Sequence, residues 1–249
     1  FTSTLRGREL LRPLPPAGQR FVTQTRPAVL FDLDGTLVDT AEDLAAALWS
    51  ACDRFGRERP PLSAARTAIG DGGPGLVRLA FGENAPEHVD ALAHLLDYYA
   101  NNIAAHSRVY APLDQLLDAL DAREVPWGVV TNKRVGLARS LLSGIGVVPT
   151  RDCIIGGDSL EVAKPHPAPL LHAAAILEVA AEHCLYIGDH SRDIDAGKAA
   201  GMRCIAAGYG YISAEEEPAQ WGAEAIASTP AELARHIEQF LTQHSGAAA

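Results

Sequence analysis

Short runs of consecutive apolar residues alternate along the chain with stretches in which apolar residues recur every three or four positions. The runs cover residues 28–31, 127–130, 153–155, 184–187 and 204–206. Unbroken runs of this length are typical of strands buried on both faces. The stretches between most of them have helical spacing, as in Leu113, Leu116, Leu117 and Leu120. The pattern therefore predicts an α/β fold, with helices on both sides of a doubly wound parallel sheet.

The alternation stops between residues 41 and 110, where the spacing is only helical. Two stripes show it: Leu44, Leu48, Cys52 and Phe55, then Val89, Leu92, Leu96, Tyr99 and Ile103. We predict that residues 41–110 form a helical cap domain, inserted into a catalytic core of residues 27–40 and 111–245. Residues 1–26 are rich in Arg and Pro and are predicted to be a flexible N-terminal extension, with a transit peptide as the alternative.

Charge and cysteine usage narrow the partners and the compartment. The 21 Lys and Arg residues against 31 Asp and Glu residues give a net charge of −10, which argues against binding to nucleic acid. No apolar run approaches the ~20 residues of a membrane span, so no membrane partner is expected. The four cysteines form no C-x-x-C pair, and three lie in apolar runs, as buried free thiols do. This usage fits a reducing compartment, and a cytoplasmic location is predicted.

Two acidic residues follow the first predicted strand directly, in an Asp-x-Asp-Gly-Thr string that begins at Asp32. Carboxylates two positions apart in an extended chain point to the same side, and ligands of parallel sheets bind beyond the carboxyl ends of strands. We therefore expect Asp32 and Asp34 to face one small volume. A hairpin turn would need a partner strand, and an EF-hand loop would need Gly in place of Leu37. Solvated loop acids are the third alternative, and Asp39 is interpreted as a cap of the following helix.

Three more polar strings follow later apolar runs. They are Thr131-Asn132-Lys133, Lys164-Pro165 and Gly188-Asp189-x-x-x-Asp193. Each has an ordinary structural explanation when taken alone: a helix cap, a surface lysine, and acids attracted to a helix N-terminus. Taken together, they place a paired carboxylate, an anion cradle, one lysine and further carboxylates at one edge of the predicted sheet.

These four strings, in this order, resemble the motifs of the haloacid dehalogenase superfamily across residues 28–207. Within it, the chain is similar to phosphoglycolate phosphatases, through residues 31–40, 130–133, 164–171 and 209–211. It also resembles the N-acetylmuramate 6-phosphate phosphatases, through residues 105–108, 127–133, 209–212 and 220–223. One departure is Arg134, where the phosphoglycolate group usually has Pro.

The resemblance implies a Rossmann-type core with an inserted helical cap, and a Mg²⁺-dependent phosphomonoesterase that acts through an aspartyl-phosphate. The expected substrate is a small phosphorylated metabolite, 2-phosphoglycolate first and N-acetylmuramic acid 6-phosphate as the alternative. It implies Asp32 as the nucleophile and Asp34 as the general acid and base. The phosphate would be held by Thr131, Asn132 and Lys164. The metal ligands would be Asp32, the main-chain carbonyl of Asp34, Asp189 and Asp193.

Substrate recognition is expected to come from the cap. The candidates are Gly72, Gly73, Arg78, His106 and Arg108, and we expect Arg108 to pair with a substrate carboxylate. The G-x-G-x-x-G string of residues 70–75 lacks the preceding strand of a dinucleotide site, and is interpreted as a flexible cap loop facing the substrate.

Four other functions fit the sequence less well. A receiver domain is about half this length and lacks a helical insertion. A phosphomutase of this superfamily usually has Val in place of Thr36, and a dehalogenase lacks the second Asp. A non-catalytic binding protein would have no need of every motif residue. The sequence carries no signal for an oligomeric state.

Overall fold

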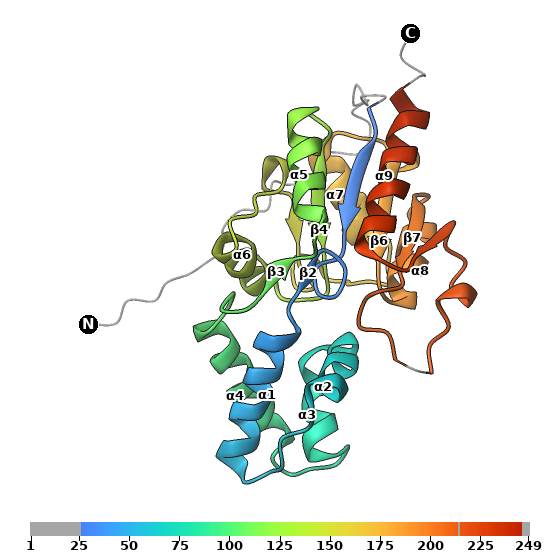
Figure 1. Ribbon diagram of the computed structural model, residues 1–249. Helices are drawn as coiled ribbons and strands as arrows, with labels where there is room; N and C mark the ends of the chain where they lie inside the picture. Colours follow the sequence, from blue (N-terminus) through green and yellow to red (C-terminus); the bar gives the residue numbers. More distant parts are fainter. Residues whose placement is uncertain (1–25, 214, 246–249) are drawn as a thin grey trace.

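Six parallel strands form one sheet in the computed structural model, which describes residues 26–213 and 215–245 (Figure 1). Across the sheet the strands are β5 (Ile154–Ile155), β4 (Trp127–Val130), β1 (Ala28–Phe31), β6 (Cys184–Gly188), β7 (Arg203–Ala207) and β8 (Ala225–Ala227). The predicted α/β fold with a doubly wound parallel sheet is confirmed. Residues 1–25 of the predicted extension lie outside the described residues.

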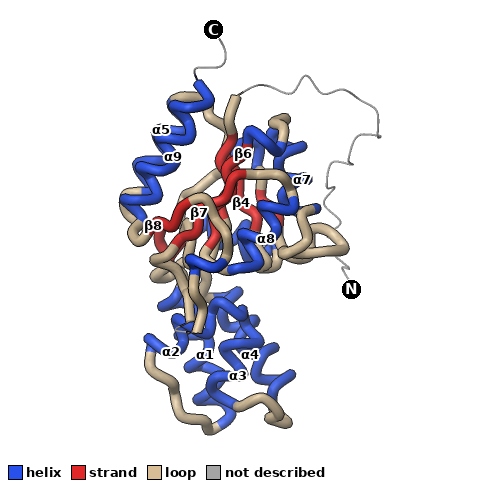
Figure 2. Tube along the Cα trace, turned by 90° about the vertical axis from the view of Figure 1, so that its right-hand side faces the viewer, coloured by secondary structure: helices blue, strands red, loops and turns tan. Residues whose placement is uncertain are grey.

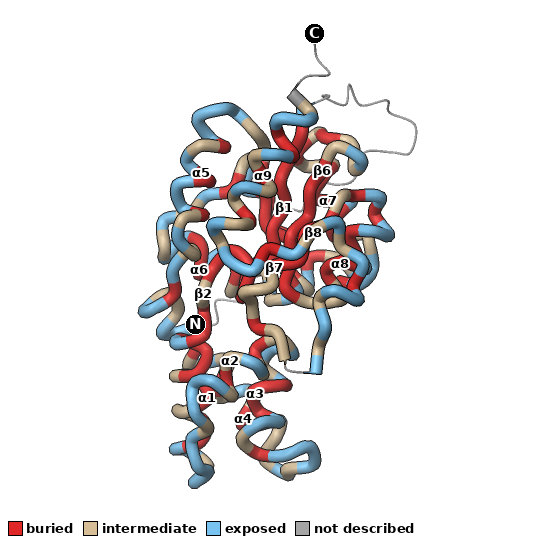
Figure 3. The backbone as a smooth tube through the Cα atoms, turned by 45° about the vertical axis from the view of Figure 1, so that its right-hand side comes forward, coloured by how far each residue is buried: buried red, intermediate tan, exposed pale blue. Residues whose placement is uncertain are grey.

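Helices cover both faces of the sheet, and the strands between them are buried (Figure 3). The side chains of the strands divide between two apolar clusters, one on each face. The core helices are α5 (Leu113–Ala122), α6 (Val135–Gly144), α7 (Ala168–Leu177), α8 (Ser191–Ala199) and α9 (Pro230–Ser245). In β1, Val29 and Phe31 pack with residues of α5, α6 and α9, whereas Ala28 and Leu30 pack with residues of α7 and α8. This alternation explains the unbroken apolar runs. All four cysteines are free and buried.

Four further helices form a separate bundle at the carboxyl ends of the strands, which we call the cap (Figure 2). They are α1 (Ala41–Phe55), α2 (Leu62–Ala68), α3 (Gly72–Phe81) and α4 (His88–Asn101). The cap has its own apolar cluster, which includes Leu48 and Leu95. Two members of the predicted stripe differ: Val89 is 77% exposed, and Ile103 lies beyond the end of α4. The domain boundaries given above stay a prediction.

The cap is joined to the core by two short strands, β2 (Val38–Asp39) and β3 (Arg108–Val109). They pair antiparallel, with Asp39 opposite Arg108, and we call this pair the connecting ribbon. The helical spacing of residues 41–110 did not predict β3, and no apolar run predicted β8. Strands of two or three residues are too short to show a periodicity.

The glycine-rich segment of residues 70–75 is helical, so its interpretation as a flexible loop is wrong. A 3₁₀ turn covers Ile69–Asp71, and α3 begins at Gly72. Pro74 lies in the first turn of α3, where its missing N–H removes no helical hydrogen bond.

Among the described helices, none combines the length and the apolar character that crossing a membrane would require.

Candidate active site

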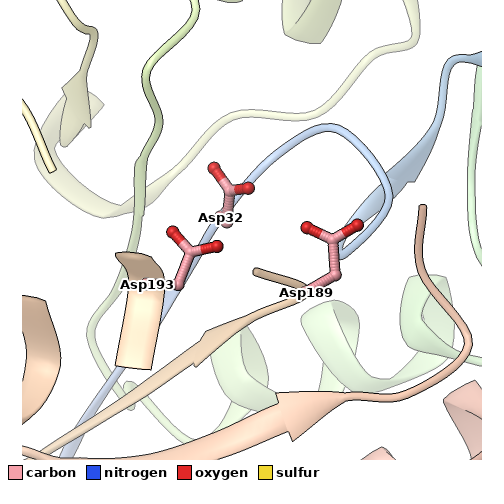
Figure 4. A group of neighbouring side chains, drawn as sticks. All are labelled: Asp32, Asp189 and Asp193. Carbon is pink, nitrogen blue, oxygen red and sulfur yellow. The ribbon is translucent and has the colours of Figure 1, made fainter. Parts of the chain in front are cut away.

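Three carboxylates meet at the carboxyl ends of two neighbouring strands. Asp32 follows β1, Asp189 follows β6, and Asp193 lies in the first turn of α8 (Figure 4). All three side chains are buried, and one oxygen of each lies within 4.8 Å of the others. We call them the acidic group. Their meeting follows from the pairing of β1 with β6, which aligns Phe31 with Ile187.

Lys164 contacts two members of the acidic group directly. Its Nζ lies 2.8 Å from Asp32 Oδ1 and 2.6 Å from Asp193 Oδ1, and its side chain is 1% exposed. It also donates to the Tyr186 hydroxyl and to the Val130 carbonyl. Burial alone would lower the pKa of Lys164, but the two carboxylates outweigh it and raise the pKa. Lys164 is therefore charged at neutral pH, and Tyr186 is a site residue that the sequence did not indicate.

The acidic group carries more negative charge than Lys164 balances. Burial, and then Asp32 and Asp193, raise the pKa of Asp189 well above its usual value. Burial also raises the pKa of Asp193, although Lys164 opposes the shift. Three carboxylates and one ammonium leave two negative charges, which a divalent cation would balance. Oxygen donors are the ligands that Mg²⁺ prefers, so these residues fit the ion that the sequence implies.

The Asp189 carboxylate needs glycine at residue 35, and at residue 210 as well, to have room. Gly35 has φ +81°, and a Cβ atom there would overlap the Asp189 carboxylate. On its other side, the Tyr211 N–H donates to Asp189 Oδ2 at 2.7 Å. Gly35 thus leaves room for the carboxylate that follows β6 and also forms the turn of its own string.

Asp34 is bound by a different lysine and stands apart from the acidic group. Lys133 Nζ lies 2.8 and 3.1 Å from its two carboxylate oxygens, and Thr40 Oγ1 donates to Oδ1 at 2.7 Å. The same Nζ lies 4.5 Å above the ring of Tyr99, a residue of α4. Burial opposes the charge of Lys133, but Asp34 and Tyr99 more than offset it and raise the pKa of Lys133. Lys133 was recognised in the sequence only as part of its string, because its partner Tyr99 comes from the cap.

Thr131 and Asn132 complete the end of β4. Thr131 is buried, and its hydroxyl accepts from the Lys133 N–H at 3.2 Å. The Asn132 amide donates to the main-chain carbonyl of Lys164 at 3.0 Å and accepts from its N–H at 3.1 Å. Asn132 therefore holds the main chain of Lys164, in addition to its expected place beside the phosphate.

A cavity of about 390 Å³ lies between the strand ends and the cap. Its core side carries charged and polar residues: Asp32, Asp34, Thr131, Asn132, Lys133, Arg134, Lys164, Asp189 and Arg192. Its remaining wall is largely apolar and contains Leu44, Ile69, Leu92, Leu95, Leu96, Tyr99 and Leu137. The Arg134 side chain is exposed and forms no hydrogen bond or ion pair with any described residue. The site thus combines a highly charged floor with an apolar wall, which we call the leucine wall.

Two of the five substrate candidates line this cavity, Gly72 and Gly73. The other three do not. Arg78 forms ion pairs with two acids of the cap, and His106 lies 3.8 Å from one carboxylate of α1. Arg108 is exposed on β3, where the chain has already entered the connecting ribbon. The expectation that Arg108 reads the substrate therefore lacks support from its position.

Comparisons with known proteins agree with this geometry. The model of the family described as haloacid dehalogenase-like hydrolase matches residues 29–207. A Pseudomonas aeruginosa protein named N-acetylmuramic acid 6-phosphate phosphatase is 37% identical, over 86% of this chain and 96% of its own length. A Xanthomonas campestris pv. campestris phosphoglycolate phosphatase is 36% identical, over 83% and 94%. The crystal structure of a predicted phosphoglycolate phosphatase from Haemophilus somnus is 28% identical, with a TM-score of 0.74 over 86% of this chain and 98% of that one.

Proposed function

The chain belongs to the haloacid dehalogenase-like hydrolases and is a phosphoric monoester hydrolase, and we propose that it works through an aspartyl-phosphate on Asp32 and depends on Mg²⁺. The observation that carries this proposal is the buried Asp32 carboxylate, 2.8 Å from Lys164 Nζ within the acidic group. A carboxylate held in this way has a free oxygen with which to attack, and a fixed cation beside the point of attack.

In the first step, an Asp32 oxygen forms a bond to phosphorus while the bond from phosphorus to the alcohol oxygen breaks. The attack brings two anions together, at a cost of ~4 kcal/mol for unit charges 4 Å apart at an effective dielectric of ~20. Lys164 offsets this repulsion because its charge lies beside Asp32. The Thr131 hydroxyl and nearby N–H groups would bind the oxygens of the transferring group.

Asp34 would move the protons of both steps. It lines the same cavity as Asp32 and lies two residues further along the chain. In the first step it gives a proton to the leaving alcohol. In the second, it takes a proton from the water that attacks the aspartyl-phosphate, so that inorganic phosphate leaves and Asp32 is restored.

Mg²⁺ would be held by Asp32, Asp189, Asp193 and the main-chain carbonyl of Asp34, and would balance the negative charge that accumulates on the phosphoryl oxygens. Asp189 is well suited to this part because it has no lysine partner and accepts only the Tyr211 N–H among the described contacts.

The cavity favours the larger of the two candidate substrates. A volume of about 390 Å³ lies in the ~300–1,000 Å³ range of pockets that enclose most of a drug-sized ligand. The two-carbon 2-phosphoglycolate would leave the leucine wall uncovered. N-acetylmuramic acid 6-phosphate has methyl groups on its acetyl and lactyl arms for that wall, and a lactyl carboxylate for Arg134. We therefore place it first, with 2-phosphoglycolate second.

Phosphate release from both compounds and from p-nitrophenyl phosphate, with Mg²⁺ present, tests this proposal. We expect kcat/KM to be highest for N-acetylmuramic acid 6-phosphate. A higher value for 2-phosphoglycolate would reject the argument from the leucine wall and support the second candidate. No phosphate release from any phosphomonoester would contradict the proposed function itself.

A further inference from the structure

One arginine of the cap binds both strands of the connecting ribbon. Arg66 lies on α2, and its Nη1 is 3.2 and 3.1 Å from the two carboxylate oxygens of Asp39, on β2. Its Nη2 donates at 2.8 Å to the hydroxyl of Tyr110, the residue that follows β3. Its guanidinium also lies 4.9 Å from the ring centre of Tyr211, in the loop after β7. The Arg66 side chain thus joins the cap to three other segments. These are β2, the residue after β3 and the loop after β7.

Hydrogen bonds continue from this arginine to the carboxylate of Asp34. The Tyr211 hydroxyl donates to Asp39 Oδ1 at 2.8 Å and accepts from the Thr40 N–H at 2.7 Å. The Thr40 hydroxyl then donates to Asp34 Oδ1 at 2.7 Å. We call this series, from Arg66 to Asp34, the ribbon network.

Two members of the ribbon network, Thr40 and Tyr211, are buried and therefore held rigidly. Thr40 is 0% exposed and Tyr211 4% exposed, so water cannot readily replace their partners. Asp39 Oδ1 accepts from the N–H of Ala41, the first residue of α1, at 3.3 Å, but the N-cap position is occupied by Thr40, so the interpretation of Asp39 as the cap of this helix is wrong. Asp39 also accepts from Nη1 of Arg66 on both of its carboxylate oxygens and from the Tyr211 hydroxyl, charged and neutral contacts that exceed what a helix cap needs.

We propose that Arg66 is a positioning residue, which acts through Asp39, Tyr211 and Thr40 to hold the Asp34 carboxylate where it can protonate the leaving alcohol. The inference rests on the proposed function, because it assumes that Asp34 is the general acid. Arg66 does not line the cavity, so its effect on the reaction is not a contact with substrate.

Leaving groups that differ in basicity separate this role from a merely structural one. A good leaving group such as p-nitrophenolate departs without a proton, whereas phenolate needs one. The ratio kcat/KM reports steps up to cleavage of the bond to the leaving group, so the later hydrolysis of the aspartyl-phosphate does not enter it. Substituted phenyl phosphates have closely similar shapes, so a defect in binding would lower kcat/KM for all of them alike.

The experiment compares Arg66→Met, Asp34→Asn and a control across this series with Mg²⁺ present. Arg59→Met is the control, because Arg59 is also a cap arginine paired with an aspartate, Asp53, but lies away from the connecting ribbon. We expect Arg66→Met to lower kcat/KM about tenfold for phenyl phosphate and less than about twofold for p-nitrophenyl phosphate. This is a fraction of the ~10²–10⁴-fold worth of a general acid.

Asp34→Asn is expected to show the same selectivity more strongly, and Arg59→Met none. Arg66→Lys, which keeps the charge but lacks the planar fork, should restore part of the loss. An equal loss on every phenyl phosphate, or no loss, for Arg66→Met would overturn the proposal. If Arg66→Met does not fold, Tyr211→Phe decides the question, since this variant removes only the Tyr211 hydroxyl from the ribbon network. It should give the same selectivity, and a uniform effect would overturn the proposal.

Asp34→Asn separates the two levels of the argument. If it lacks the dependence on the leaving group, Asp34 is not the general acid, and the proposed chemistry fails together with this inference. If it has that dependence and Arg66→Met does not, only the positioning role fails.

Discussion

Replacing Asp189 by Asn should make the metal-free protein more stable while abolishing its activity. The Asp189 carboxylate is buried beside Asp32 and Asp193, with oxygens within 4.8 Å. At that distance and an effective dielectric of ~20, each pair of charges repels by about 3.5 kcal/mol. Lys164 attracts Asp189 more weakly than Asp32 or Asp193 repels it, so the variant should gain at least about 3 kcal/mol, the repulsion of one pair. The Asn oxygen can still accept the Tyr211 N–H, so the local hydrogen bond is kept.

The gain should depend on pH in a defined direction. The pKa of Asp189 is raised by burial and by its acidic neighbours, so the folded protein holds this proton more tightly than the unfolded chain does. The wild-type protein therefore loses stability as the pH rises above ~3.9, the unfolded value, and through the raised folded value. The Asn side chain does not titrate, so the advantage of Asp189→Asn should grow with pH.

Urea unfolding in the presence of a chelator, at about pH 5 and about pH 8, measures this effect. Added Mg²⁺ should stabilise the wild type and have little effect on Asp189→Asn, because the variant lacks a proposed ligand and a charge. The reasoning would be refuted if the variant were no more stable than the wild type in chelator at the higher pH. Equal stabilisation of both proteins by Mg²⁺ would remove Asp189 from the metal site.

Three further predictions concern Arg134 in the cavity, the main chain of Lys164 and the buried His172. Arg134→Met should lower kcat/KM for N-acetylmuramic acid 6-phosphate by an amount that corresponds to ~1.5–3 kcal/mol of lost transition-state stabilisation, the worth of a hydrogen bond to a charged group. It should leave kcat/KM for p-nitrophenyl phosphate unchanged. Arg139→Met is its control, because Arg139 lies on α6, the helix that follows Arg134, and outside the cavity lining. Equal losses on both substrates would contradict the role of Arg134. Asn132→Ala should lower kcat by ~10-fold or more with little change in the urea midpoint, since a 1 Å misplacement of Lys164 is costly to catalysis. An unchanged kcat would show that the two hydrogen bonds between Asn132 and the Lys164 main chain are dispensable. His172 is buried without a hydrogen-bond partner among the described residues, and burial lowers its pKa. As the pH falls, the imidazole of the unfolded chain is therefore protonated before that of the folded protein. The free energy of unfolding should decrease as the pH drops below ~6.5, the unfolded value. His172→Gln should flatten this part of the stability profile measured by urea unfolding, and an unchanged slope would assign it to other groups.

The parts of the site that the sequence predicted are those set by local geometry. Asp32 and Asp189 each follow an apolar run directly, and parallel pairing brings such strand ends together. Asp193 follows one helical turn later, so its position depends on nothing distant. The order of apolar runs and acids along the chain therefore places these three residues at one edge of the sheet, and the pairing of β1 with β6 brings them together.

The parts that the sequence did not predict depend on packing between distant segments. Tyr186 looks like any other residue of a buried strand, and only the fold brings its hydroxyl to Lys164. Lys133 gains its second partner, Tyr99, only when α4 packs above the strand ends. Arg108 was chosen for its charge, but the pairing of two very short strands places it outside the cavity. A choice among cap residues by charge alone cannot anticipate such placement.

The most direct test of the central claim is the detection of a phosphoryl group on Asp32. The protein would be mixed with a phosphomonoester and Mg²⁺, quenched in acid within milliseconds, and digested for mass spectrometry. We expect one phosphoryl group on the peptide that contains Asp32, and its release by neutral hydroxylamine, as for an acyl phosphate. The Asp32→Asn variant should carry none and release no phosphate. A fully active enzyme that never carries phosphate on Asp32, or an Asp32→Asn variant that keeps more than about a hundredth of the wild-type rate, would contradict the account.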